Sequence, residues 1–149
     1  MSQPYFPTKI LIVTDGTEDA RLAIGMAGEL TATGSELHLV HVTTVARGLY
    51  PDFLSPQQIK RIKTEAQHSL DQDVSFAEAS GIKLTTSSSR LGRIDAETLG
   101  AADDIGAGLI IIANRTGDAL ERILLGNEVE SVVRHANCPV LVVRQAKSA

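Results

Sequence analysis

The sequence predicts an α/β fold, in which an open, doubly wound sheet of five parallel strands carries helices on both faces. Three observations predict it. Five short runs rich in Val, Ile and Leu alternate with four longer segments of helical periodicity. One run, Leu109–Ala113, is entirely apolar, as expected of a strand buried on both faces. Gly34, Gly81 and Gly106 each follow a helical segment and end it. Strands that alternate with helices pair in parallel through right-handed crossovers.

The chain begins with a strand, a helix and a second strand. Lys9–Thr14 is a continuous run of Ile, Leu and Val that the turn dipeptide Asp15-Gly16 closes. Thr17 is suited to cap the following helix, because its hydroxyl can accept a hydrogen bond from a free backbone N–H of the first turn. This helix is expected to stop near Gly34, and the second strand follows at Glu36–Val42.

The middle of the chain contains an irregular segment, a long helix and a polar strand. Thr43–Leu54 has no clear hydrophobic period. Ser55-Pro56 is typical of a helix start, since Ser caps the helix and Pro occupies its first position. Gly81 ends this helix, and Ile82–Ser89 is predicted as a third strand whose polar composition places it near a sheet edge. The apolar face of the helix is formed by Ile59, Ile62, Ala66 and Leu70.

The C-terminal part repeats the alternation of helix and strand. The third helix is predicted at Ile94–Ile105 and the fourth strand at Leu109–Ala113. A loop over residues 114–125 leads to a helix at Asn127–His135, and the last strand is Pro139–Arg144.

Length and composition indicate one domain over residues 1–149, with its core at about residues 8–145. The chain has 14 Lys and Arg against 18 Asp and Glu, so no basic surplus exists to neutralise the phosphates of a nucleic acid. A single Cys excludes an intramolecular disulfide and a cysteine-cluster metal site. No segment approaches the ~20 apolar residues of a membrane span, and residues 1–8 lack the apolar core of a signal peptide. We expect a cytoplasmic protein without a nucleic-acid or membrane partner.

Three segments are candidates for a ligand site, because ligands of open α/β sheets bind beyond the carboxyl ends of the strands. The first is Thr14-Asp15-Gly16, which also fits a tight turn whose Asp accepts hydrogen bonds from nearby backbone N–H groups. The second is His41-Val42, for which a packed or surface histidine is the plainer interpretation. The third combines residues 113–117 with Gly126-Asn127, where the free N–H groups of a helix start attract anions.

Four segments of the chain, taken in order, carry a family resemblance. They read KILIVTDGTEDARLA at the front, GSELHLVHV at the second strand, LGRIDAETLGAADDIGAGLIIIANR in the middle and ERILLGNEVESVVRHANCPVLVVR at the end. The last is the most specific, and residues 43–81 are the main part left uncovered. A chain with these segments resembles the universal stress protein family.

The resemblance implies a Rossmann-like fold with strand order 3-2-1-4-5 and a homodimer. Family dimers are often built by antiparallel pairing of the last strands. The residues support this independently, because a terminal apolar strand has an open edge with which another strand can pair. The alternative is that residues 145–149 or a loop cover this edge. The interface strand contains Val140, Leu141, Val142 and Val143.

The resemblance also implies an adenine-nucleotide site, in altered form. Members of the family that bind ATP carry a motif of three glycines. Two residues separate the first Gly from the second, nine residues separate the second from the third, and Ser or Thr follows directly. Three of the four positions depart here, and the β-branched Thr116 disfavours the positive φ that glycine permits. Gly117 could take over this role through a one-residue shift. The four positions fall at Ala113, Thr116, Gly126 and Asn127. The residues expected at a retained site are Thr14, Asp15, Val42, Ala113, Arg115, Thr116, Gly117, Gly126, Asn127 and Glu128.

Charge around the phosphate loop opposes a triphosphate. Glu128 lies in the first turn of the predicted helix, where its carboxylate takes the dipole position that a phosphate would use. Arg115 could offset this charge by covering a bound phosphate. Asp15 matches the family's acidic residue near the nucleotide, and Val42 matches the position whose backbone meets the adenine. We therefore expect the adenosine half of the site to be better kept than the triphosphate half. ATP binding is expected to be weakened or lost, AMP stays a candidate ligand, and Mg²⁺ accompanies only ATP.

Together these observations predict a non-enzymatic, homodimeric stress-response or signalling module with a degenerate ATP/AMP site. One alternative is an ATP-binding member with a remodelled phosphate loop. An ATP-hydrolysing enzyme is less favoured, because the chain has no Walker-type loop and His38 and His41, three apart in a strand, face opposite sides and cannot share a metal. A further alternative is a dimer that binds an unknown protein partner through residues 43–58. Tyr50 and Phe53 would then be anchors, instead of a lid over the crevice or part of the core.

Overall fold

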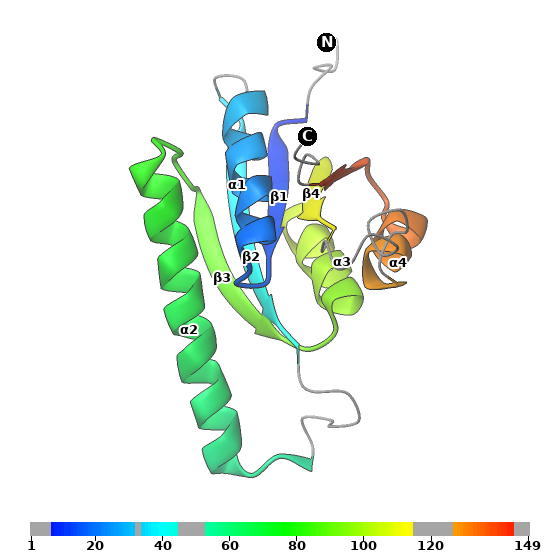
Figure 1. The fold of residues 1–149 in the computed structure, drawn as a ribbon. Helices are drawn as coiled ribbons and strands as arrows, with labels where there is room; N and C mark the ends of the chain where they lie inside the picture. The colour runs from blue at the N-terminus through cyan, green and yellow to red at the C-terminus, as the bar shows by residue number, and fades with distance from the viewer. Residues whose placement is uncertain (1–6, 32–33, 45–52, 115–126, 145–149) are drawn as a thin grey trace, which may run out of the picture.

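A computed structural model describes residues 7–31, 34–44, 53–114 and 127–144. The described strands form one parallel sheet in the order β3-β2-β1-β4-β5 (Figure 1). This confirms the predicted fold class and strand order. The strands are β1 (Lys9–Thr14), β2 (Glu36–Thr43), β3 (Thr86–Leu91), β4 (Leu109–Ala113) and β5 (Val140–Val143).

Helices pack on both faces of the sheet, with α1 and α2 on one face and α3 and α4 on the other. Thr17 caps α1 as predicted, and Ser55 forms a capping box with Gln58 at the start of α2. None of the described helices is long and apolar enough to cross a membrane. The helices are α1 (Glu18–Leu30), α2 (Pro56–Ala79), α3 (Ile94–Ile105) and α4 (Asn127–His135).

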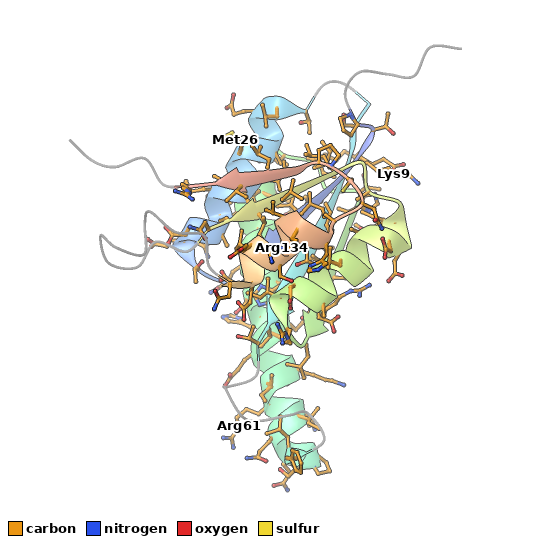
Figure 2. The ribbon with its side chains drawn as sticks, turned by 90° about the vertical axis from the view of Figure 1, so that its right-hand side faces the viewer. Lys9, Met26, Arg61 and Arg134 are labelled. Carbon is orange, nitrogen blue, oxygen red and sulfur yellow. The ribbon has the colours of Figure 1, made fainter. Side chains whose placement is uncertain are left out.

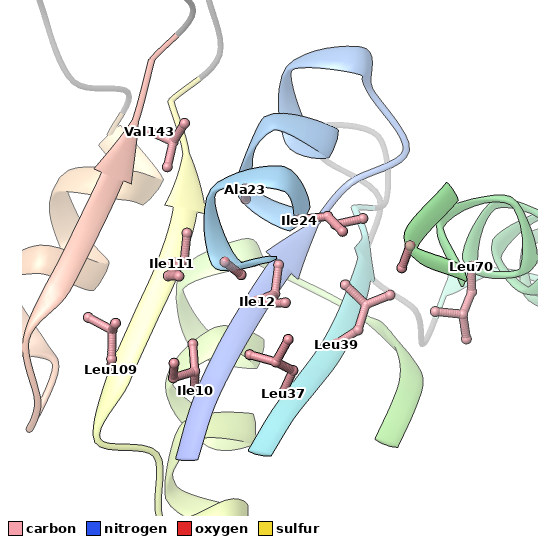
Figure 3. Close-up of a cluster of buried hydrophobic side chains, with 12 residues drawn as sticks. Ile10, Ile12, Ala23, Ile24, Leu37, Leu39, Leu70, Leu109, Ile111 and Val143 are labelled. Carbon is pink, nitrogen blue, oxygen red and sulfur yellow. The ribbon is translucent and has the colours of Figure 1, made fainter. Parts of the chain in front are cut away.

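Alternation along the strands produces two buried layers. Ile10 and Ile12 of β1 belong to the layer against α1 and α2, whereas Leu11 and Val13 belong to the layer against α3 and α4. Figure 3 shows the first layer, in which side chains of the sheet pack beneath Ile24 of α1. Because β1 is buried on both faces, its sequence is apolar at every position from 10 to 13.

The predicted bounds of the third strand are wrong at both ends, since β3 covers residues 86–91 instead of 82–89. The reason lies at the end of α2. The backbone N–H of Ile82 donates a hydrogen bond of 2.9 Å to the carbonyl of Ala77, so this residue still belongs to the helix ending. Ile82 and Leu84 pack against the layer under α1 and α2 without joining the ladder, which begins where Thr86 meets His38. The predicted edge position of this strand is confirmed.

The long helix α2 extends past the sheet (Figures 1 and 2). Its 24 residues span about 36 Å, against about 20 Å for a six-residue strand. Ile59 and Ile62, predicted on its apolar face, are accordingly only half-buried. Phe53 is 76% exposed, so the core alternative is wrong for this residue, and Tyr50 lies outside the described residues. The buried positions of α2 are Ala66, Leu70, Asp73 and Ala77.

Two glycines provide a matched test of the helix assignments. Gly106 ends α3 with φ +68°, a conformation that costs a residue with a Cβ atom about 1–2 kcal/mol. Gly25 lies inside α1, and a Cβ atom added there meets no other heavy atom within 4 Å. Gly106→Ala should therefore lower the free energy of unfolding by about 1 kcal/mol, and Gly25→Ala should raise it by about 0.5–1 kcal/mol. Urea denaturation measures both, and effects of the same sign would contradict the assignment.

Candidate functional site

A pocket lies beyond the carboxyl ends of β1 and β4, where the strand order reverses. The chain adds β2 and β3 on one side of β1, then β4 and β5 on the other, so the connections leave in opposite directions and open a crevice between them. The pocket has a volume of about 80 Å³. Its apolar walls include Val13, Ile94, Ile112 and Val129, and its polar residues are Thr14, Asp15, Asn114 and Glu128.

Asp15 shapes the turn at the edge of this pocket. Its Oδ1 accepts hydrogen bonds from the backbone N–H of Thr17 at 3.1 Å and from the hydroxyl of Thr17 at 2.6 Å. The same hydroxyl accepts a bond from the N–H of Ala20 at 3.2 Å and so caps α1. The turn interpretation of Asp15 is confirmed. Since the residue also lines the pocket, its structural role and a ligand-binding role are compatible.

The structure brings four of the predicted site residues together in the pocket lining: Thr14, Asp15, Ala113 and Glu128. Asn127 is exposed at the start of α4, directly before Glu128. Val42 is 1% exposed, and its side chain belongs to the layer against α3 and α4 instead of the pocket lining. The predicted contact was with its backbone, and this stays a prediction. The remaining predicted residues, Arg115, Thr116, Gly117 and Gly126, lie outside the described residues.

Asn114 lies within the third candidate segment, residues 113–117, but it was not among the residues expected at a retained site. This side chain is 2% exposed at the end of β4, and its backbone N–H donates a hydrogen bond of 2.9 Å to the carbonyl of Val143. A polar residue directly after an apolar strand, on the expected ligand side of the sheet, was the available signal. Ile94 and Val129 were missed for a different reason, because only the packing of α3 and α4 brings these apolar side chains to the pocket.

The described lining of the pocket is acidic. Its charged side chains are Asp15 and Glu128, and no cation is among its described residues. Glu128 lies in the first turn of α4, where a carboxylate interacts favourably with the positive end of the helix dipole. This arrangement opposes a group of high negative charge at the same place. It is compatible with a ligand that presents hydroxyls or amines to the two carboxylates.

Asp95 holds the start of α3 beside the pocket wall formed by Ile94. Its carboxylate accepts hydrogen bonds from Arg93 at 3.1 and 3.0 Å and from the backbone N–H of Ala96 at 2.9 Å. Burial by itself raises the pKa of Asp95. Hydrogen bonds from Arg93, Ser131 and Ala96, together with the charge of Arg93, outweigh burial and leave the pKa below its usual value. Because Ser131 belongs to α4, this carboxylate links the two helices that frame the pocket.

The two histidines of β2 face opposite sides of the sheet, as predicted. His38 is hydrogen-bonded through Nδ1 to Thr86 Oγ1 at 2.7 Å and through Nε2 to Glu36 Oε2 at 3.2 Å. His41 lies on the other face, with Nδ1 3.5 Å from Asp73 Oδ2. In the described part of the chain, no group of three or more His, Cys, Asp or Glu residues could hold a metal ion.

Comparison with known proteins identifies the family. The model of the universal stress protein family matches residues 7–144. A universal stress protein of Methanocaldococcus jannaschii is 35% identical over an alignment of 144 positions, which covers 93% of this chain and 83% of the relative. Among solved structures, the universal stress protein UspA from Lactobacillus plantarum is 25% identical with a TM-score of 0.71, covering 92% of this chain and 97% of its own. A universal stress protein in complex with cAMP is 20% identical with a TM-score of 0.68, covering 93% and 97%. The chain belongs to the universal stress protein family.

Asp95→Asn tests the electrostatic link between α3 and α4. A carboxylate whose pKa is lower in the folded than in the unfolded state stabilises the fold above its unfolded pKa, and this stabilisation is lost as the pH falls through the folded pKa. The variant should lose roughly 1–2 kcal/mol of unfolding free energy at pH 7, and the difference from the unmodified protein should shrink as the pH falls below about 4. Urea denaturation between pH 3 and 7 measures it. A difference that is constant with pH would contradict the assignment.

Proposed function

We propose that this universal stress protein binds an adenine nucleotide with a single phosphate, of the AMP class, in the pocket between β1 and β4. It binds ATP weakly or not at all, and acts as a non-enzymatic, homodimeric stress-response or signalling module. The observation that carries the proposal is the pair of carboxylates, Asp15 and Glu128, that line the pocket. Asp15 follows β1 and Glu128 begins α4, so one lies on the adenosine side and the other on the phosphate side of the proposed site.

The charge of the ligand decides which nucleotide is favoured. Two unit charges 4 Å apart interact by about 4 kcal/mol at an effective dielectric constant of 20, typical near a protein surface. Each added phosphate therefore increases the repulsion from Glu128, and the described lining offers no cation against it. Adenosine is neutral, and its ribose hydroxyls can donate hydrogen bonds to Asp15. The cAMP held by one of the structural relatives is also an adenine nucleotide with one phosphate.

The proposed homodimer rests on the open edge of β5. This strand pairs only with β4 among the described strands, and Val140, Leu141 and Val142 stay half-exposed. The carbonyls of Pro139 and Val143 accept hydrogen bonds from the β4 side. Since carbonyls and N–H groups alternate in direction along a strand, the N–H and C=O of Val140 and Val142 point away from the sheet. A second copy of this strand, in antiparallel orientation, would satisfy these groups and bury the apolar side chains.

Calorimetry with the purified protein tests the ligand preference. AMP should bind at least about tenfold more tightly than ATP-Mg, and Glu128→Gln should strengthen ATP binding about three- to tenfold by removing the repulsion, with a smaller gain for AMP, which has a single phosphate. Glu130→Gln is the matched control, because Glu130 shares the first turn of α4 but does not line the pocket. Micromolar binding of ATP by the unmodified protein would favour the alternative, an ATP-binding member with a remodelled phosphate loop. Steady release of phosphate from ATP would instead indicate an enzyme.

Val142→Pro tests the dimer without disturbing the sheet. Proline removes an N–H that points away from β4, and edge strands tolerate this change. The variant should sediment as a monomer and keep the circular dichroism spectrum of the unmodified protein, which should sediment as a dimer. A dimeric variant, or a monomeric unmodified protein at concentrations of tens of micromolar, would count against pairing through β5.

A further inference from the structure

We propose that Arg21, His41 and Asp73 form a positioning cluster, which holds the Asp15-Gly16 turn and the end of β2 in place from the face of the sheet opposite α3 and α4. The effect of the cluster on ligand affinity rests on the proposed nucleotide site. The effect of the cluster on the turn does not rest on that site, and it can be measured in the protein without ligand.

Asp73 is the unexpected residue of the cluster. It is 1% exposed and occupies the buried stripe of α2 between Leu70 and Ala77, where the helical period calls for an apolar side chain. A buried carboxylate is retained only at a large desolvation cost, and apolar replacements of buried ion pairs are often as stable or more stable. Packing alone therefore gives no reason for an acid at this position, which points to a role that depends on its charge.

Two partners from other elements approach this carboxylate. Arg21 of α1 places its Nε 3.6 Å from Asp73 Oδ1, and His41 of β2 places its Nδ1 3.5 Å from Asp73 Oδ2. Arg21 also lies over the ring of Phe76, 5.7 Å from its centroid, which adds a cation–π contact on α2. One carboxylate thus joins α1, α2 and β2 at the carboxyl end of the sheet.

His41 connects Asp73 to the Asp15-Gly16 turn. It is 3% exposed and stands beside Thr14 in the register of β1 and β2. A Cβ atom at Gly16 would lie 3.3 Å from His41 Cε1, closer than an ordinary van der Waals contact, so the ring and the turn are already packed together. Gly16 has φ +85°, which a larger residue would adopt only with strain. A change in the position of the ring therefore alters its packing against the turn.

The cluster lies next to the two residues expected on the adenosine side of the proposed site, Asp15 and Val42. Gly16 directly follows Asp15, and His41 directly precedes Val42. Small displacements of a binding group cost affinity, because the contacts are short and directional. None of its three members is among the described lining of the pocket, so they are positioning residues and not ligand contacts.

The experiment combines a measurement without ligand and a measurement with AMP. Asp73→Asn keeps the size of the side chain and removes its charge. It should raise the exchange rate of the Thr17 amide, whose N–H donates to Asp15, by about tenfold relative to the core amide of Ile111, and weaken AMP binding by a similar factor. His38→Gln is the matched control, since His38 is a buried histidine of the same strand on the opposite face. It should leave the Thr17 amide and AMP affinity within about twofold.

A second variant separates positioning from stability. In the triple variant Arg21→Met, His41→Leu and Asp73→Leu, apolar side chains replace the whole cluster. This variant should have the thermal midpoint of the unmodified protein, but it should regain neither the slow exchange of the Thr17 amide nor the AMP affinity. Recovery of all three, or an unchanged Thr17 exchange rate in Asp73→Asn, would overturn the proposal. If the unmodified protein does not bind AMP, the proposed function fails, and the Thr17 exchange rate alone decides for or against the cluster.

Discussion

The burial of β1 on both faces is the constraint on which the rest of the structure depends. This strand pairs with β2 on one side and β4 on the other, and it supplies side chains to both buried layers. A strand in this position cannot present a polar side chain to either helix layer without leaving it unsolvated. The polar residues at its carboxyl end, Thr14 and Asp15, stand where the layers end and the pocket begins.

The position of the pocket follows from the same constraint. The strand β1 is central, and the chain places β2 and β3 on one side of it before it places β4 and β5 on the other. The connections that follow the carboxyl ends of β1 and β4 therefore leave in opposite directions. The acidic character of the described pocket then comes from two residues with independent structural reasons. Asp15 holds the start of α1 through Thr17, and Glu128 lies at the positive end of the α4 dipole.

The strands and helices with strong local signals were predictable. The apolar runs of β1 and β4 and the capping residues Thr17 and Ser55 each depend on neighbouring residues along the chain. The bounds of β3 were not predictable, because Ile82 and Leu84 are apolar in order to cover the core beneath α1 and not in order to pair as a strand. The burial of Asn114 was not predictable for a related reason, since it depends on how β4 and β5 end together.

The sequence by itself determined the family, the order of the elements and the acidic residues beside the expected ligand site, because these depend on residue type and on spacing along the chain. Only the tertiary structure decided that Asp73 meets Arg21 and His41, since these residues lie on three elements that are far apart in the sequence. Helical period placed Asp73 on the buried side of α2 but could not supply its partners. Burial of a charge is favourable only when the fold brings compensating groups to it, and that is a property of packing in three dimensions.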